Sequence, residues 1–541
     1  MLMGLLRCAV DRDPAKAAVV SGARRLSYGG LLEETERWAT GLHGRGLREG
    51  DTLAVVLPGG VDFVIAFFAA MRLGVVLLPL NPHFTETELE RFLRDGRARL
   101  IITDAKRQGL CAEVAARLEG SPAVLLAELE FESLDARAVP APAVTRRTGP
   151  ALFLYTSGST DTFKRVLCTQ ENLYYEAHNF VSTLDLGPDD NILCAIPLYH
   201  SYGVGNGLLD AVCQAATLVI LESGEDESEG PFGSRLGRVF KLIAREHVRV
   251  YPGVPHQFAA LAAHGAAGAG DLSGLRFCVS SGDVLPRDTF ERFLARYGHP
   301  IRSLYGSTEA GSVAIDASPA AEVVYGSLGR PLANVSLDIR DGEGVSLPSG
   351  RAGAIWIRSP VIPDPVYDNR APDPAVYRDR YFNSGDEGLI DSHGRLVMTG
   401  RKQSFVDIAG YKVDIAEVEE ALRACPGVTD SAALGVDVPR MGTLIKAVVV
   451  GPDSVTDADI RAHCLRALAF FKVPRLIERR LRGRRSAARA PAPAVRDRGG
   501  RSGGGGPQSR AKRDFEECRF HRAGLRLIPG DRADGASGVR T

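Results

Sequence analysis

"TSGSTDTFKRV", residues 156–166, places two serines, three threonines and a glycine between an apolar run and a lysine. Such a composition lets backbone N–H groups and hydroxyls converge on phosphate oxygens, while Lys164 can reach outer phosphates as a mobile charge. Asp161 puts a negative charge inside the same stretch. The stretch is not a Walker loop, because that motif continues from lysine to serine or threonine, whereas Arg165 follows here. Taken alone, the pattern also describes a polar surface turn.

Length and charge bound the protein class. A chain of 541 residues is too long for a single hydrophobic core, so two or three domains are expected. Its 66 Lys and Arg residues balance 66 Asp and Glu residues, which gives no overall field that favours nucleic acid or an anionic membrane. We therefore expect no nucleic-acid partner.

The cysteines and apolar segments bear on the compartment. The nine cysteines are scattered without a Cys-x-x-Cys pair, which favours reduced, mostly buried thiols in a cytoplasmic protein. The apolar run at the N-terminus is too short for a signal peptide. The most apolar stretch, residues 61–82, is interrupted by Arg72 and Gly74. It is expected to form a buried helix and a buried strand rather than a membrane span.

Hydrophobic periodicity predicts an α/β fold. Strands are expected at residues 52–58, 98–104, 217–221 and 275–282, and amphipathic helices at residues 26–46 and 85–96. Their alternation predicts a large N-terminal domain of layered, largely parallel sheets over residues 1–400. Closely spaced strands predict a β-rich subdomain at about residues 320–400. A small, compact α+β C-terminal domain is expected at residues 401–478.

The last segment, residues 479–541, is rich in Arg, Gly, Ala and Pro and has neither helical nor strand periodicity. Such a composition predicts disorder, because it cannot build a core. A frameshift in a GC-rich coding region is a second explanation, since out-of-frame GC-rich codons yield mainly these residues. A genuine basic tail is the alternative. Translating the other two frames beyond codon 478 separates the two, because only a frameshift leaves a Gly-Lys motif in another frame.

Four further segments follow the opening stretch in order: "IPLYHSYG" (196–203), "YGSTEAG" (305–311), "NSGDEGLID" (383–391) and "GRKQSFVDIAGYKVDIAEVEEAL" (400–422). Together the five resemble the ordered motifs of the adenylate-forming superfamily, which contains acyl- and aryl-CoA ligases, nonribosomal peptide adenylation domains and luciferases. With residues 77–93, the similarity covers roughly residues 10–478.

The resemblance implies a two-step ligase. A carboxylic acid would be activated by ATP and Mg²⁺ as an acyl adenylate, and its acyl group would pass to the thiol of CoA or of a carrier-protein phosphopantetheine. The acid would be a small aryl or aliphatic one. A free α-amino acid is not expected, because Ser201 stands where amino-acid-activating relatives commonly have an aspartate.

The resemblance also assigns roles to individual residues. Contacts with ATP are implied for Thr156, Ser157, Gly158, Ser159, Thr160, Lys164, Gly282, Asp283, Tyr305, Gly306, Thr308, Asp386 and Arg401. Within this set, Asp386 would accept the ribose hydroxyls and Thr308 would contact the α-phosphate. Glu309 would hold Mg²⁺, a cation that prefers oxygen ligands. Catalytic roles are implied for Lys164, His200, Thr308, Glu309 and Arg401.

Each assignment has a plainer alternative. Glu309 also fits a solvated carboxylate, Tyr305 a core aromatic residue and His200 a satisfied core or surface group. Asp386 also fits a turn residue, since residues 386–395 read as two strands joined by a turn, and Arg401 also fits a surface ion pair.

Departures from the motifs leave an alternative function open. Asp161 and Arg165 replace glycines; the aspartate repels a triphosphate, and the arginine is expected to offset part of that repulsion. Ser404 stands where relatives often have a hinge aspartate or lysine. The Gly-Lys motif that relatives carry beyond a segment like residues 470–478 is missing, and Lys512 lacks its surroundings. The alternative is therefore a relative that binds nucleotide or acid without efficient adenylation.

Overall fold

The computed structural model describes residues 1–127, 148–156, 164–222, 232–264, 271–401, 405–408, 411–438, 442–452 and 454–480. The expectations for Asp161, for Ser404 and for the tail beyond residue 480 lie outside these residues.

One large sheet has the strand order β15-β14-β13-β12-β11-β9-β10-β1-β2. Its strands are β1 (Ala17–Ser21), β2 (Arg24–Ser27), β9 (Asn191–Cys194), β10 (Leu218–Ile220), β11 (Val248–Gly253), β12 (Phe277–Ser280), β13 (Ile301–Ser307), β14 (Gly311–Ile315) and β15 (Arg330–Pro331). Its central strands, β13-β12-β11-β9-β10-β1, pair in parallel. At the two edges, β2, β14 and β15 are antiparallel to their neighbours.

A second sheet has the order β6-β5-β3-β4-β7-β8. Its strands are β3 (Thr52–Val56), β4 (Val76–Pro79), β5 (Ala98–Thr103), β6 (Ala123–Leu126), β7 (Pro150–Thr156) and β8 (Lys164–Thr169). They pair in parallel except for the antiparallel pair β7–β8. All five residues of β3 are buried, as expected for a parallel strand covered on both faces.

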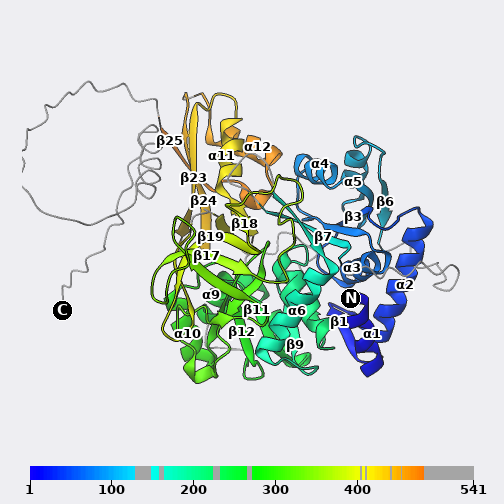
Figure 1. Ribbon diagram of the computed structural model, residues 1–541. Helices are drawn as coiled ribbons and strands as arrows, with labels where there is room; N and C mark the ends of the chain where they lie inside the picture. Colours follow the sequence, from blue (N-terminus) through cyan, green and yellow to red (C-terminus); the bar gives the residue numbers. More distant parts are fainter. Residues whose placement is uncertain are drawn as a thin grey trace, which may run out of the picture.

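Helices pack around and between these sheets (Figure 1). They are α1 (Leu2–Arg12), α2 (Tyr28–Gly44), α3 (Val61–Leu73), α4 (Glu86–Asp95), α5 (Gln108–Ala115), α6 (Gln170–Leu184), α7 (Asp210–Cys213), α8 (Leu236–Arg245), α9 (Pro255–Ala263) and α10 (Arg287–Tyr297). Short helical turns are the π-helix η1 (Gly203–Leu209) and the 3₁₀ turns η2 (Phe232–Arg235) and η3 (Ala320–Glu322).

The apolar segment at residues 61–82 behaves as the sequence predicts. It forms α3, which is buried on nearly every side, and then β4. Gly74 ends the helix in a left-handed conformation with φ 69°, and Arg72 pairs with Glu36 instead of meeting solvent. No described helix combines the length and apolarity that crossing a membrane requires.

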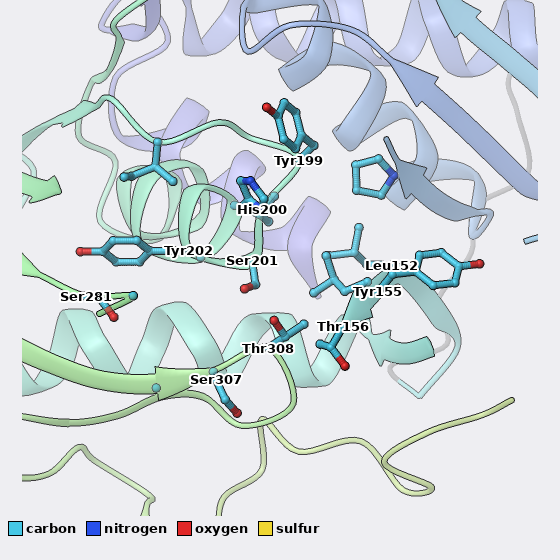
Figure 2. Close-up of a pocket in the computed structure, with 18 of the residues that line it drawn as sticks. Leu152, Tyr155, Thr156, Tyr199, His200, Ser201, Tyr202, Ser281, Ser307 and Thr308 are labelled. Carbon is cyan, nitrogen blue, oxygen red and sulfur yellow. The ribbon is translucent and has the colours of Figure 1, made fainter. Parts of the chain in front are cut away.

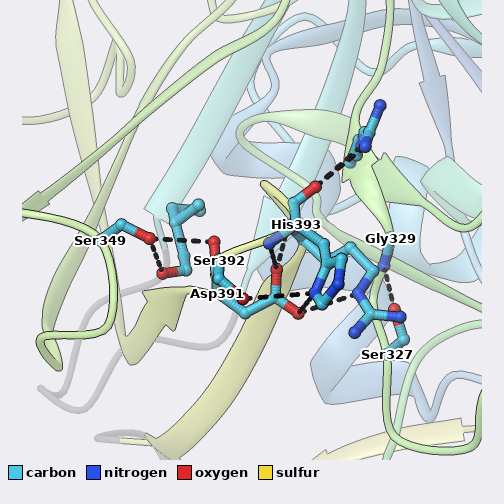
Figure 3. Close-up of polar contacts among 9 residues, drawn as sticks. Ser327, Gly329, Ser349, Asp391, Ser392 and His393 are labelled. Carbon is cyan, nitrogen blue, oxygen red and sulfur yellow. Dashed lines mark hydrogen bonds and ion pairs between the residues drawn. The ribbon is translucent and has the colours of Figure 1, made fainter.

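Beyond residue 335, strands dominate. They form a five-stranded sheet of β16 (Ser336–Arg340), β17 (Gly353–Arg358), β18 (Tyr377–Arg378), β19 (Tyr381–Ile390) and β20 (Leu396–Arg401). In the turn between β19 and β20, Asp391 Oδ1 accepts hydrogen bonds from the backbone N–H groups of His393 and Arg395, each at 2.8 Å (Figure 3). The turn aspartate is therefore Asp391, whereas Asp386 lies within β19.

The small C-terminal domain has its own apolar core. It contains the hairpin β21 (Phe405–Ile408) and β22 (Tyr411–Asp414), the helices α11 (Ile415–Arg423) and α12 (Asp457–Ala467), the turn η4 (Phe470–Lys472), and the sheet β23 (Asp430–Val438), β24 (Gly442–Val450) and β25 (Leu476–Arg480). The fold class predicted from sequence is thereby confirmed.

Candidate active site

A cavity of about 240 Å³ lies where the two large sheets meet the small domain. Its walls include the carboxyl ends of β4 and β7 in one sheet and of β13 in the other, together with Tyr411 and Lys472 of the small domain. Ligands of open α/β sheets commonly bind outside the carboxyl ends of the strands. The cavity is therefore the candidate site.

The structure brings several sequence-predicted residues to this cavity. Its lining includes Thr156, His200, Gly282, Gly306 and Thr308. Figure 2 shows Thr156 beside Thr308, with His200 and Ser201 facing them. Gly282 has φ 95°, a conformation that favours glycine at this turn.

Glu309 lies next to this lining and has two hydrogen-bond donors. Its Oε1 accepts from Tyr367 Oη at 2.8 Å and from Thr156 Oγ1 at 3.3 Å. Lys164 Nζ lies 5.2 Å from the centre of the Tyr367 ring. Burial lowers the pKa of Lys164, and the Glu309 carboxylate opposes this shift. A cation, a carboxylate and a phenol thus share one corner of the site.

Glu309 fits the role of a magnesium ligand. Mg²⁺ is usually held by one or two carboxylates together with substrate phosphates, so a large protein cage is not needed. No group of three or more His, Cys, Asp or Glu side chains with metal-binding geometry occurs among the described residues. Tyr367 orients the carboxylate, and sequence reasoning missed it because a lone tyrosine in an irregular, proline-rich segment carries no periodic signal.

A second polar cluster, with Tyr305 and Asp386 outside the cavity lining, involves β13, β19 and β20. Tyr305 Oη donates to Asp386 Oδ2 at 2.8 Å, and both residues are buried. Arg401 pairs directly with Asp386 across β19 and β20, so the two backbones lie side by side. The Tyr305 segment and the Asp386 segment therefore meet in space, although 81 residues separate the two side chains.

Other predicted residues lie elsewhere. Asp283 is exposed, accepts a hydrogen bond from the backbone N–H of Val284, and is not in the cavity lining. The predictions for Ser157, Gly158, Ser159 and Thr160 fall outside the described residues, although the strand pair Thr156–Lys164 that flanks them is described.

Arg165 forms ion pairs with two carboxylates. Its guanidinium donates to Asp368 Oδ1 and Oδ2 at 2.9 and 3.0 Å and to Asp95 Oδ2 at 3.0 Å. Two carboxylates thus compensate its charge, and the arginine ties β8 to two other segments. The expectation that Arg165 offsets part of the repulsion between Asp161 and a triphosphate stays a prediction, because Asp161 lies outside the described residues.

The small domain closes the cavity through groups that sequence reasoning missed. Lys472 Nζ lies 2.7 Å from Glu88 Oε1 of α4 and 2.8 Å from Glu417 Oε1 of α11. The Tyr411 ring stacks on Phe471 at 4.1 Å between centroids. Burial and a hydrogen bond with Tyr411 raise the pKa of Tyr199. A lysine within the apolar stretch at residues 470–474 was the signal that could have revealed this contact.

Comparison with known proteins agrees with the fold. The family described as AMP-binding enzyme matches residues 6–363, and the AMP-binding enzyme C-terminal domain matches residues 417–482. A feruloyl-CoA synthase of Amycolatopsis sp is 32% identical over 471 residues, which are 86% of this chain and 92% of the relative. An oxalate–CoA ligase of Arabidopsis thaliana is 29% identical and covers 88% of this chain and 94% of its own.

Solved structures show the same fold. The amide bond synthetase McbA of Marinactinospora thermotolerans superposes with a TM-score of 0.76 at 25% identity, covering 88% of this chain and 95% of that protein. An o-succinylbenzoate CoA synthetase from Bacillus subtilis reaches a TM-score of 0.78 at 23% identity over 89% of this chain and 96% of its own. The extent of these matches shows that this chain belongs to the AMP-binding, adenylate-forming enzyme family.

Proposed function

We propose that this protein is an acid–thiol ligase that activates a carboxylic acid with ATP and transfers the acyl group to CoA. The observation that carries the proposal is the meeting of Thr156, Lys164, Thr308 and Glu309 at the rim of a largely apolar cavity. The rim suits phosphates and the cavity suits the organic part of an acid. The names of the relatives feruloyl-CoA synthase and oxalate–CoA ligase support CoA as acceptor.

The first step forms a bond between a carboxylate oxygen and the α-phosphorus of ATP, and pyrophosphate leaves. Positioning and charge compensation dominate catalysis of such a transfer. Thr308 would donate to an α-phosphate oxygen, and Lys164 would compensate charge on the outer phosphates. Mg²⁺ held by Glu309 would supply further charge compensation when bound.

Other residues hold the reactants in place. Asp386 would accept ribose hydroxyls, with Arg401 opposite it on β20, while His200 would lie beside the acid carboxylate. Tyr305, Gly282 and Gly306 would border the adenine. In the second step the CoA sulfur bonds to the carbonyl carbon, and AMP leaves with the bridging oxygen.

The substrate would be an aryl or aliphatic acid. Ser201 faces the cavity at the place where the resemblance puts an aspartate in enzymes for amino acids, so the ammonium of an α-amino acid has no carboxylate there.

A carrier-protein thiol is the alternative acceptor. The free thiols of the eight described cysteines suit a reducing compartment such as the cytoplasm.

The small domain, which we place at residues 401–478, would move relative to residues 1–400 between the two steps. The alternative function, a relative deficient in adenylation, rests on sequence beyond residue 480. The comparisons lend it no support.

Acid-dependent exchange of labelled pyrophosphate into ATP tests the proposal, with AMP release measured after CoA is added. A panel of aryl and aliphatic acids should contain at least one that drives both signals. Glu309→Gln should reduce exchange by about 10²–10³-fold, since one group aimed at developing charge has this effect. Glu322→Gln, on the exposed turn η3, is the matched control. Absence of exchange with every acid, although synthetic acyl adenylates and CoA give thioester, would identify the adenylation-deficient alternative.

A further inference from the structure

Four polar side chains form a hydrogen-bonded chain in the wall of the cavity. Ser312 Oγ of β14 lies 2.7 Å from Glu176 Oε1 of α6 and 3.1 Å from Asn206 Oδ1 of η1. Asn206 Nδ2 lies 3.1 Å from Asp210 Oδ2 at the start of α7. Each of the four side chains belongs to a residue that is at most 7% exposed. Glu176, Asn206 and Ser312 line the cavity, and Asp210 lies behind them.

Two glycines shape the space around Glu176. A Cβ atom on Gly311 would lie 2.0 Å from Glu176 Oε2, and one on Gly205 would lie 3.0 Å from Oε1. Gly311 also has φ 62°, which favours glycine. The backbone is therefore shaped so that a carboxyl group can occupy this wall. A wall that needed only apolar packing would not require this room.

If both Ser312 Oγ contacts are hydrogen bonds, one carboxyl in the chain must be protonated. The Ser312 hydroxyl has one hydrogen but faces two acceptors, Glu176 Oε1 and Asn206 Oδ1. In one arrangement Glu176 is protonated and donates to Ser312. In the other, the Asn206 amide is reversed and donates to Ser312, so a protonated Asp210 must donate to the amide oxygen. Burial raises the pKa of both carboxyls.

The carboxyl that stays ionised, whether Glu176 or Asp210, has no cation beside it. Among the described residues, no Lys, Arg or His forms an ion pair with Glu176 or Asp210, and none contributes to their pKa shifts. Asp210 Oδ1 has no hydrogen-bond partner in the described part of the chain. Buried acceptors without donors are costly, and within this chain a ligand in the cavity can reach only the three members that line it, Glu176, Asn206 and Ser312.

We infer that this wall, Glu176–Ser312–Asn206–Asp210, selects carboxylic acids that carry a hydrogen-bond-donating amine or hydroxyl away from the reacting carboxyl group. The inference rests on the proposed function and names the substrate class of the same site. A donor on the substrate would add a hydrogen bond to Glu176, whose two oxygens already lie 2.9 Å from the backbone N and 2.7 Å from the Oγ of Ser312, whereas a methyl group of similar size would add none. Hydrogen bonds to charged groups contribute enough to give a preference of about 10- to 100-fold.

Matched acids test this selection. We would measure kcat/KM by AMP release with CoA for aminobenzoates and hydroxybenzoates, each compared with the methylbenzoate substituted at the same ring position. At one ring position or more, the donor-bearing acid should exceed its methyl counterpart by about 10- to 100-fold. Glu176→Gln should lower this ratio to about one. Glu171→Gln, in the first turn of the same helix, should leave the ratio unchanged.

Binding and spectroscopy extend the test beyond turnover. Calorimetric titration of the same acids into protein saturated with AMP gives the preference without catalysis, and Ser312→Ala serves as the second variant should Glu176→Gln fold poorly. An infrared C=O band of a protonated carboxylic acid, altered by Glu176→Gln, is also expected. Equal affinity and equal kcat/KM within every matched pair would overturn the inference. Absence of pyrophosphate exchange with every acid, together with selective binding of the donor-bearing ones, would reject the proposed function instead.

Discussion

Breaking the ion pair between α4 and the small domain should undock that domain. The side chains of Lys472, Glu88 and Glu417 are only 8%, 7% and 19% exposed. Lys472→Met leaves two buried carboxylates facing one another without a cation. Removing one partner of a buried pair costs about 3–5 kcal/mol. Glu88 belongs to the large domain, whereas Glu417 and Lys472 belong to the small one. Part of this free energy is therefore lost from docking between the domains, and part is lost from the stability of the small domain itself.

Glu88→Gln separates the two parts, since it leaves the Lys472–Glu417 pair within the small domain intact. Glu88 also caps α4 by accepting from Thr85, and the glutamine oxygen can preserve that bond. We expect weaker docking with an unchanged unfolding midpoint for the small domain. Glu86→Gln, which removes an exposed pair with Arg117, is the control and should cost at most about 1 kcal/mol.

Hydrogen exchange followed by mass spectrometry measures the docking at residues 411–417 and 470–475. Lys472→Met should reduce protection there by about 10²–10⁴-fold, the equivalent of 3–5 kcal/mol. Unchanged protection in both Lys472→Met and Glu88→Gln would refute the reasoning.

The pH dependence of docking follows from the same ion pair. Burial acts to lower the pKa of Lys472, but Glu417 and Glu88 outweigh it, and the net shift is upward. A raised lysine pKa contributes stability that is fully present below the ordinary value of about 10.4. Protection should therefore hold from neutral pH to about 10 and fall as the pH rises through the raised pKa.

Three further outcomes are expected. Tyr367→Phe removes one of the two donors to Glu309 and should lower kcat/KM for ATP by about fivefold in pyrophosphate exchange, the effect of one ordinary hydrogen bond. Arg165→Ala removes the paired contacts with Asp368 and should lower the free energy of unfolding by about 2 kcal/mol in urea titrations. A maleimide should label exposed Cys8 in the folded protein, whereas burial and pKa values raised to about 12 should protect three thiols until unfolding: Cys168, Cys194 and Cys278.

Local pattern alone determined much of the fold. Alternation of β-branched runs with amphipathic segments predicted β3, β5, β10, β12, α2 and α4 close to their observed bounds. The strand expected at residues 275–282 ends earlier, at Ser280, because Gly282 turns the chain with φ 95°. These successes share one reason: strand and helix periods are properties of neighbouring residues.

Ordered motifs in the sequence also pointed to residues at the rim of the cavity, of which the structure brings Thr156, Thr308 and Glu309 together. The partners that orient them could not be read in this way. Tyr367 lies 58 residues from Glu309, Ser312 lies 136 from Glu176, and Lys472 lies 384 from Glu88. Strand order and domain docking decide which of these distant side chains meet, and neither leaves a periodic trace along the chain. Periodicity and ordered motifs were therefore enough to predict the elements and the family, whereas the packing of distant segments against one another sets which buried charges share a wall or an interface.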